Sequence, residues 1–114
     1  MEKYRVVHYI NQFFAQIGGE EMAGIAPQIR EEPVGPGKIL QNILGDDAEL
    51  VATVICGDTY FAENLETVVP QILEMIRPYK PDFVIAGPGF ASGRYGISCA
   101  AICSAINKQL GIPA

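Results

Sequence analysis

The stretch DFVIAGPGFASGRYGI, residues 82–97, decides the fold that the sequence predicts. Its first part, residues 83–86, is short, apolar and partly β-branched, which is typical of a strand buried on both faces. Residues 87–96 then carry several glycines and Arg94, and an apolar helical pattern follows them. This order of strand, glycine-rich loop and helix predicts an open α/β sheet in which such loops, at the carboxyl ends of the strands, bind a ligand.

The rest of the chain follows the same plan. Strands are expected at residues 4–10 and 50–56, both apolar almost throughout, as in parallel strands covered on both faces. Apolar residues at helical spacing predict helices at residues 39–44, 65–76 and 99–110. The expected fold is a three-layer α/β domain, Rossmann-like or flavodoxin-like, with a mainly parallel sheet of three to four strands and helices on both faces.

Two features of the sequence bear on the expected domain organisation: its last residues and one long connection between predicted elements. Another strand of a doubly wound sheet would begin near residues 112–114, so we predict that residues 1–114 are a single α/β domain, truncated at an unfinished sheet edge. Such an edge is expected to pair with a second copy or to continue into a longer protein. Residues 18–37, rich in glycine and proline, predict a long irregular connection, which is either functional or partner-binding, or a mobile surface excursion.

Composition excludes several classes of function. A net charge of -5 and a pI near 4.7 provide no basic patch for nucleic acid or for an anionic membrane. No apolar run approaches the roughly 20 residues of a membrane span, and the charged amino terminus does not resemble a signal peptide. Three cysteines without CxxC spacing fit a reducing compartment. We therefore expect a cytoplasmic protein.

The glycine-rich loop does not match either phosphate-binding motif. Ser92 stands where the third glycine of a dinucleotide fingerprint belongs, and no Gly-Lys-Ser or Gly-Lys-Thr follows. Backbone N–H groups beside a helix amino terminus, together with the guanidinium of Arg94, suit a small carboxylate instead. For Arg94 and Tyr95 a ligand-binding role and a structural role both remain open.

Other candidate site residues lie at the ends of the predicted strands. Cys56 and Asp58 end the second strand with a thiol and a carboxylate, although a structural role for Cys56 is the more common one for such a residue. His8 and Asn11, from the first strand, are weaker candidates, because a lone histidine inside a strand is more often buried and hydrogen-bonded. The predicted site therefore comprises Cys56, Asp58, Arg94 and Tyr95, with His8 and Asn11 added.

Two more cysteines could suggest a metal or redox centre. Cys99 and Cys103 lie four residues apart on the last predicted helix. Neither a second histidine nor a nearby carboxylate completes a ligand set, so we interpret both as small buried residues and predict no metal site.

Four long strings, in order, carry a resemblance to a known family. They are VVHYINQFFAQIGGEE (residues 6–21), REEPVGPGKILQ (30–41), ATVICGDTYFAEN (52–64) and PDFVIAGPGFASGRYGISCAAIC (81–103). Together they resemble the start of the selenoprotein B subunit of glycine, sarcosine and betaine reductases. The resemblance covers essentially the whole chain, and only the front part of the family's longer polypeptide.

The resemblance implies a component of an anaerobic reductase complex of amino-acid fermentation. In that family the B component holds glycine, sarcosine or betaine, whose C–N bond is cleaved reductively in a reaction sequence that ends in acetyl phosphate. The family's selenocysteine lies beyond the matched part, and a pyruvoyl group belongs to a different subunit. The implied partners are the other subunits of the complex and the small amino-acid substrate, and activity of this chain alone is not expected.

Two other classes of function stay open beside the reductase component. The first is a stand-alone carboxylate-binding module that uses the same loops without chemistry. The second is a purely structural or subunit-interaction domain, in which residues 18–37 dock on a partner.

Overall fold

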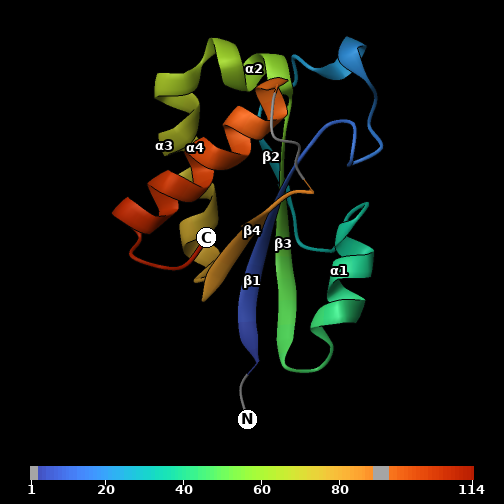
Figure 1. The fold of residues 1–114 in the computed structure, drawn as a ribbon, viewed down its shortest axis with the longest axis vertical. Helices are drawn as coiled ribbons and strands as arrows, with labels where there is room; N and C mark the ends of the chain where they lie inside the picture. The colour runs from blue at the N-terminus through green and yellow to red at the C-terminus, as the bar shows by residue number, and fades with distance from the viewer. Residues whose placement is uncertain (1–2, 89–92) are drawn as a thin grey trace.

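A mixed four-stranded sheet forms the centre of the computed structural model, which describes residues 3–88 and 93–114 (Figure 1). The strand order is β2-β3-β1-β4. β1 (Tyr4–Asn11) runs parallel to both of its neighbours, β3 (Ala48–Cys56) and β4 (Phe83–Ala86). β2 (Gln28–Arg30) pairs antiparallel with β3. The prediction of a mainly parallel sheet with three to four strands is therefore confirmed.

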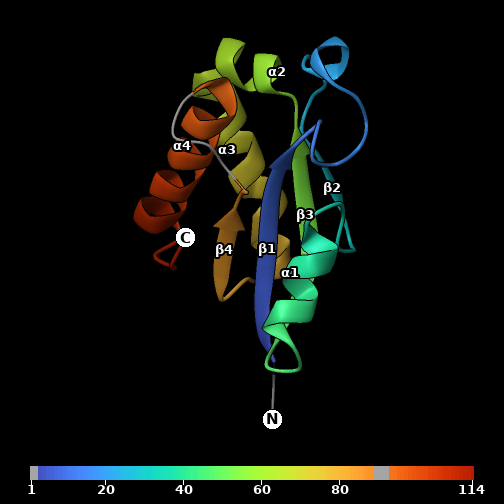
Figure 2. The ribbon, with the colours of Figure 1, turned by 45° about the vertical axis from the view of Figure 1, so that its right-hand side comes forward.

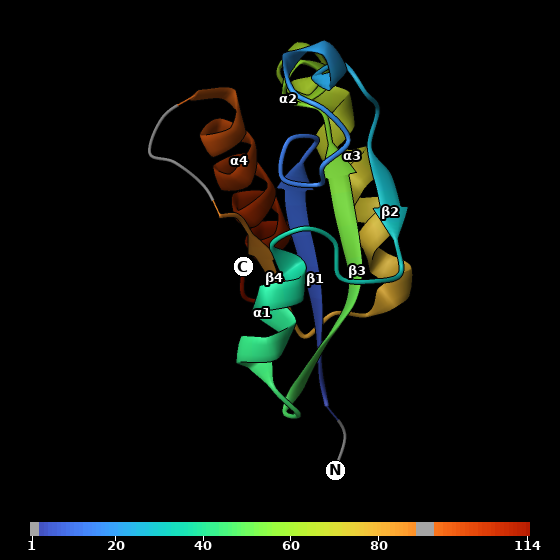
Figure 3. The same ribbon diagram turned by 90° about the vertical axis from the view of Figure 1, so that its right-hand side faces the viewer.

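Helices cover both faces of this sheet, as predicted. α3 (Leu65–Ile76) and α4 (Gly93–Gln109) lie on one face, and α1 (Gly37–Leu44) lies on the other (Figures 2 and 3). The main core packs Val7 and Tyr9 of β1 against apolar side chains of α3 and α4. His8, between them in the sequence, points to the opposite face, where its ring lies close to Gly37. Both faces of β1 are buried, which explains its nearly continuous apolar sequence.

An irregularity in the β1–β3 pairing directs side chains to the two faces. Val6 pairs with Leu50 but Val7 pairs with Ala52, so Val51 is an extra residue in β3. Such a bulge changes which face the following side chains occupy. Leu50 accordingly lies against Gly37 of α1, whereas Ala52 joins the core under α3 and α4.

Four short elements were missed by the sequence patterns. β2 lies within residues 18–37, where we predicted an irregular connection, and the 3-10 helix η1 (Glu20–Met22) lies there as well. α2 (Asp58–Glu63) begins immediately after β3, where no helix was predicted. Elements of three to six residues are too short to show a periodic apolar pattern. A second 3-10 helix, η2 (Arg77–Tyr79), follows α3.

The glycine-rich loop is shorter than predicted. We expected it to span residues 87–96, but α4 begins at Gly93 and therefore contains Arg94, Tyr95 and Gly96. Residues 89–92 of the predicted loop lie outside the described part. The predicted helix at residues 65–76 is confirmed as α3, and the one at 99–110 is confirmed as the later part of α4.

A close backbone approach fixes the loop between β1 and β2 on the start of α2. The carbonyl oxygen of Ala23 accepts hydrogen bonds from the N–H groups of Thr59 (2.8 Å) and Tyr60 (3.0 Å). A Cβ atom at Gly57 would lie 2.2 Å from that same oxygen. Only glycine fits at this position, because the backbone of the loop occupies the space of a side chain.

The edge of β4 that faces away from β1 forms a hydrogen bond with the last residues of the sequence. The N–H of Val84 donates to the carbonyl oxygen of Pro113 over 3.1 Å. Pairing of this edge with a second copy stays a prediction. No helix within residues 3–88 and 93–114 has the length and apolar character needed to cross a membrane.

Candidate functional site

The carboxyl end of β1, the loop that follows it and the first turns of α2 and α4 line a cavity of about 540 Å³. The chain leaves β1 toward β3 on one side and later crosses to β4 on the other side of β1. Ligands of open α/β folds bind at such a switch point, outside the carboxyl ends of the strands. The described residues that line the cavity are Asn11, Gln12, Phe13, Phe14, Gly19, Glu20, Asp58, Gly93, Arg94 and Tyr95.

Asn11, the last residue of β1, connects two parts of this wall. Its side-chain Nδ2 donates to Asp58 Oδ2 over 3.0 Å, and its Oδ1 accepts the N–H of Phe14 over 2.9 Å. One amide group therefore orients the Asp58 carboxylate and also fixes the turn that follows β1.

Gln12 supports the same arrangement from the next position. Its Oε1 accepts the backbone N–H of Asp58 over 3.2 Å, and its Nε2 donates to the carbonyl oxygen of Gly19 over 3.3 Å. The side chain is buried. Gln12 thus links the start of α2 to the loop that carries Glu20.

Asp58 is the buried carboxylate of the site, with 8% of its surface exposed. Oδ2 is bonded to Asn11, whereas Oδ1 is buried without a hydrogen-bond partner. Burial raises the pKa of Asp58 above its ordinary value, and the contacts with Asn11, Arg94 and Gln12 oppose this shift. The exposed Glu20 carboxylate adds a small upward contribution to that pKa.

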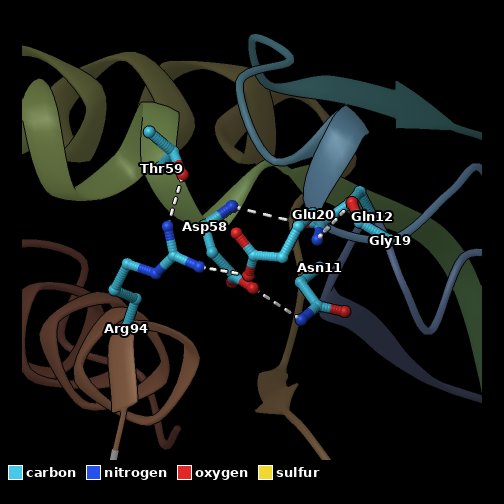
Figure 4. Close-up of polar contacts among 7 residues, drawn as sticks. All are labelled: Asn11, Gln12, Gly19, Glu20, Asp58, Thr59 and Arg94. Atoms are coloured by element: carbon cyan, nitrogen blue, oxygen red, sulfur yellow. Dashed lines mark hydrogen bonds and ion pairs between the residues drawn. The ribbon is translucent and has the colours of Figure 1, made fainter.

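Arg94 approaches the cavity from the first turn of α4 (Figure 4). Its Nη2 forms an ion pair with the carboxylate of Glu20, and its Nη1 donates to the hydroxyl of Thr59. Figure 4 shows the guanidinium facing the carboxylates of Glu20 and Asp58. A carboxylate from another part of the chain therefore already lies on the arginine that we predicted as a carboxylate binder.

Tyr95 follows Arg94 but is buried, with 6% of its surface exposed. Its ring lies against that of Phe14, with the ring centroids 5.5 Å apart. The hydroxyl lies near the Cys99 thiol but has no hydrogen-bond partner of acceptable geometry. Burial is the main reason why the pKa of Tyr95 is well above its usual value, so the hydroxyl is neutral at physiological pH.

The structure separates two of the predicted site residues from this cavity. His8 is buried on the α1 face of the sheet, where its Nε2–H donates to the carbonyl oxygen of Gly87. Cys56 is fully buried in the core under α3 and α4, and burial raises the pKa of its thiol to about 12. The buried, hydrogen-bonded interpretation of His8 is confirmed, and a substrate-binding role for Cys56 stays a prediction.

The other predicted residues lie together, and three further polar residues join them. Asn11, Asp58, Arg94 and Tyr95 all line the cavity, whereas Gln12, Glu20 and Thr59 were not predicted. Gln12 directly follows the first strand, so its position at a strand end was a usable signal. Nothing in the local sequence distinguishes Glu20 from Glu21 beside it.

Metal-ligating residues do not cluster in the described part of the chain. Within residues 3–88 and 93–114, no three or more histidine, cysteine, aspartate or glutamate side chains are placed to hold a metal ion. Cys99 and Cys103, which we expected to be buried, are half-buried on α4, and neither forms a disulfide. The difference arises because Tyr95, Ser98 and Ile102 take the inward positions of this helix.

The fold and the cavity define an α/β domain with a cavity, lined by both polar and apolar side chains, at the carboxyl edge of its parallel strands. The family model described as glycine/sarcosine/betaine reductase selenoprotein B matches residues 3–114. The chain belongs to this family. No solved structure matched the chain.

Relatives with each of the three reductase names support the assignment. The chain is 59% identical over 114 residues to the glycine reductase complex component B subunit gamma of Carboxydothermus hydrogenoformans. It is 56% identical over 113 residues to the sarcosine reductase complex component B subunit beta of Peptoclostridium acidaminophilum. The betaine reductase complex component B subunit beta of the latter organism is 35% identical over 109 residues. The matches cover 96% to 100% of this chain but only 25% or 26% of each relative.

Proposed function

We propose that this chain is the amino-terminal α/β part of the substrate-binding component B of a glycine, sarcosine or betaine reductase. The relatives that carry these names support the proposal, and each is about four times as long as the chain. The observation that carries the site assignment is the polar constellation of Asn11, Asp58 and Arg94 around one cavity. These residues come from β1, α2 and α4 and lie together at the carboxyl edge of the sheet.

Arg94 is the proposed anchor for the carboxylate of the substrate. A guanidinium can donate two parallel hydrogen bonds to a carboxylate, and the Glu20 carboxylate already pairs with it. Glycine, sarcosine and betaine all carry a carboxylate, so one arginine could serve each of them. The neutral Tyr95 and the apolar Phe14 would then form the less polar side of the cavity.

The reaction of the assembled complex would be reductive C–N bond cleavage of the bound amino acid, leading to acetyl phosphate. None of the 114 residues is a selenocysteine, so in this proposal the selenocysteine and the pyruvoyl group are supplied elsewhere in the complex. The other reductase subunits are the proposed partners, in the cytoplasm of an anaerobic organism. The residues of this chain would bind and orient the substrate.

A carboxylate-binding module without chemistry is the alternative, and one observation favours it. The thiols of Cys56 and Cys99 have pKa values raised by burial to about 12 and about 11, so neither is an activated nucleophile. Binding groups are therefore present around the cavity, whereas an activated thiol is absent among these two.

The carboxylate role is tested by calorimetric titration of the assembled component with glycine, sarcosine and betaine. The Arg94→Ala variant is expected to lose about tenfold or more in affinity for each of them, the size of a lost hydrogen bond between charged groups. Arg77→Ala removes an exposed arginine from η2, after α3, and is the matched control. Unchanged affinity in the Arg94→Ala variant would refute the proposed carboxylate site.

A further inference from the structure

Asp58 has one carboxylate oxygen whose hydrogen-bonding capacity is unused. Oδ2 accepts from Asn11, but Oδ1 is buried and has no partner, although the residue is only 8% exposed. Buried polar atoms are nearly always satisfied, because leaving one unpaired costs free energy. The same residue lines the 540 Å³ cavity, so a ligand can supply the missing donor.

The charges around the cavity indicate the sign of that ligand group. Asp58 and Glu20 are two carboxylates, and Arg94 is the one cationic side chain among the described lining residues. Arg94 forms an ion pair with Glu20 and also interacts electrostatically with Asp58, so two carboxylates share one cation and leave an excess of negative charge (Figure 4). Four other groups interact electrostatically with Asp58: the hydroxyls of Tyr9 and Tyr95 and the thiols of Cys56 and Cys99. Burial raises the pKa of each of them, so all four are neutral at physiological pH. An unpaired anionic acceptor in this position suits a cation that carries an N–H donor.

Asn11 keeps this oxygen available. The Asn11 amide nitrogen donates to Asp58 Oδ2, and the Asn11 amide oxygen accepts the N–H of Phe14. The Asn11 amide therefore cannot rotate without losing a hydrogen bond. Gln12 holds the backbone of Asp58 in place as well. The carboxylate is therefore fixed through Oδ2 and through the backbone, while Oδ1 is held without a partner, as a preorganised acceptor would be.

We propose that Asp58 Oδ1 accepts a hydrogen bond from the ammonium group of the substrate and selects amines that carry at least one N–H. This inference rests on the proposed function, in which Arg94 binds the carboxylate of the same molecule. Asp58 and Arg94 then recognise the two ends of an amino-acid zwitterion. A primary or secondary amine satisfies Oδ1, whereas a quaternary amine buries it beside methyl groups that cannot donate. Asp58 is thereby a specificity-determining residue, and Asn11 is a positioning residue.

Glycine, sarcosine and betaine provide a matched set of probes. All three have the same carboxylate, but the number of N–H bonds on the nitrogen decreases from glycine to sarcosine, and betaine has none. In titrations of the assembled component, glycine and sarcosine are expected to bind at least about tenfold more tightly than betaine, because only they can donate to a buried charged acceptor.

Asp58→Asn tests the residue itself, because it keeps the shape and removes the charge. This variant is expected to lose about tenfold or more in affinity for glycine while its affinity for betaine stays within about twofold, and Asp58→Glu should restore part of the glycine preference. Asp46→Asn, at an exposed position before β3, is the control and should change neither affinity. Circular dichroism of each variant confirms that it folds.

The outcomes separate this inference from the proposed function. If the wild-type protein binds betaine as tightly as glycine, or if Asp58→Asn keeps the glycine preference, the ammonium site is refuted while the carboxylate site at Arg94 stands. If the wild-type protein binds none of the three probes, the proposed function is refuted and the ammonium site with it.

Discussion

The side-chain amide of Asn11 donates a 3.0 Å hydrogen bond to Asp58 Oδ2 and so joins the end of β1 to the start of α2, which follows the neighbouring strand β3. Both side chains are buried. The two residues are 47 positions apart, yet this bond sets the orientation of a carboxylate whose other oxygen is buried without a partner. The geometry of the site therefore depends on the pairing of the two strands.

Asn11→Asp should destabilise the protein in a pH-dependent way. Two carboxyl groups would then share one buried position, which raises the pKa of one of them in the folded state above its unfolded value of about 4. The folded state therefore loses stability as the pH rises from the unfolded pKa of about 4 toward the higher pKa of the folded state. We expect the free energy of unfolding at pH 7 to fall by roughly 1–3 kcal/mol, with a smaller loss near pH 4.

Denaturant unfolding at both pH values measures this effect. Asn42→Asp, at an exposed position on α1, introduces the same charge away from the site and serves as the control. Equal losses at the two pH values would show that the two carboxyl groups do not interact.

Glu20→Gln should strengthen carboxylate binding. The Glu20 carboxylate now competes with any ligand for the guanidinium of Arg94. Because an ion pair between exposed side chains stabilises by at most about 1 kcal/mol, its removal should increase affinity for glycine by up to roughly fivefold. Titration calorimetry provides the measurement, with Glu66→Gln on α3 as an exposed control. Weaker binding in the Glu20→Gln variant would mean that Glu20 contacts the ligand directly.

Gly57→Ala should destabilise the fold, because the new methyl group would meet the backbone of residues 23–25. Its carbon would lie only 2.2 Å from the Ala23 carbonyl oxygen, so the loop must move. Forced overpacking of this kind costs roughly 1–3 kcal/mol. Gly24→Ala is a matched control, since a Cβ there meets nothing within 4 Å. Thermal unfolding compares the two variants, and equal melting temperatures would argue against the close approach.

His8 should make the protein sensitive to mild acid. Burial lowers the pKa of His8 below its ordinary value, and the bond to the Gly87 carbonyl only partly opposes this shift. The unfolded chain therefore binds a proton first, so the stabilisation is complete above about pH 6.5 and is lost as the pH falls below it. His8→Gln keeps a donor for Gly87 and should flatten the decline of the unfolding free energy between about pH 6.5 and 5. An unchanged slope would assign the acid sensitivity to other groups.

The cysteine thiols should react slowly in the folded protein. Cys56 is fully buried with a thiol pKa of about 12, and the pKa of Cys99 is about 11, so thiolate is scarce at pH 8. Reaction with a disulfide reagent should be slow before denaturation and rapid afterwards, and Cys56→Ala should remove the slowest phase. A rapidly reacting Cys56 in the native state would restore it as a candidate nucleophile.

The long elements could be predicted because their signals are local. The apolar pattern of residues 65–76 matches α3 at both ends, and the runs at residues 4–10 and 50–56 lie within β1 and β3. Residues 28–30 and 58–63 gave no comparable signal, because a strand or helix of that length is stabilised mainly by its tertiary contacts. The position of Arg94 on α4 was missed for another reason, because the glycines at 93 and 96 indicated a loop.

The sequence by itself determined the α/β class, the principal strands and helices, and the family. Apolar periodicity indicated the class and the elements, and long motifs in the right order indicated the family. Only the tertiary structure decided which polar groups share the cavity. Asn11 meets Asp58 across 47 positions and Arg94 meets Glu20 across 74, contacts that exist because β1 lies between β3 and β4. The unpaired oxygen of Asp58 follows from that strand order and from burial, which no local pattern of residues encodes.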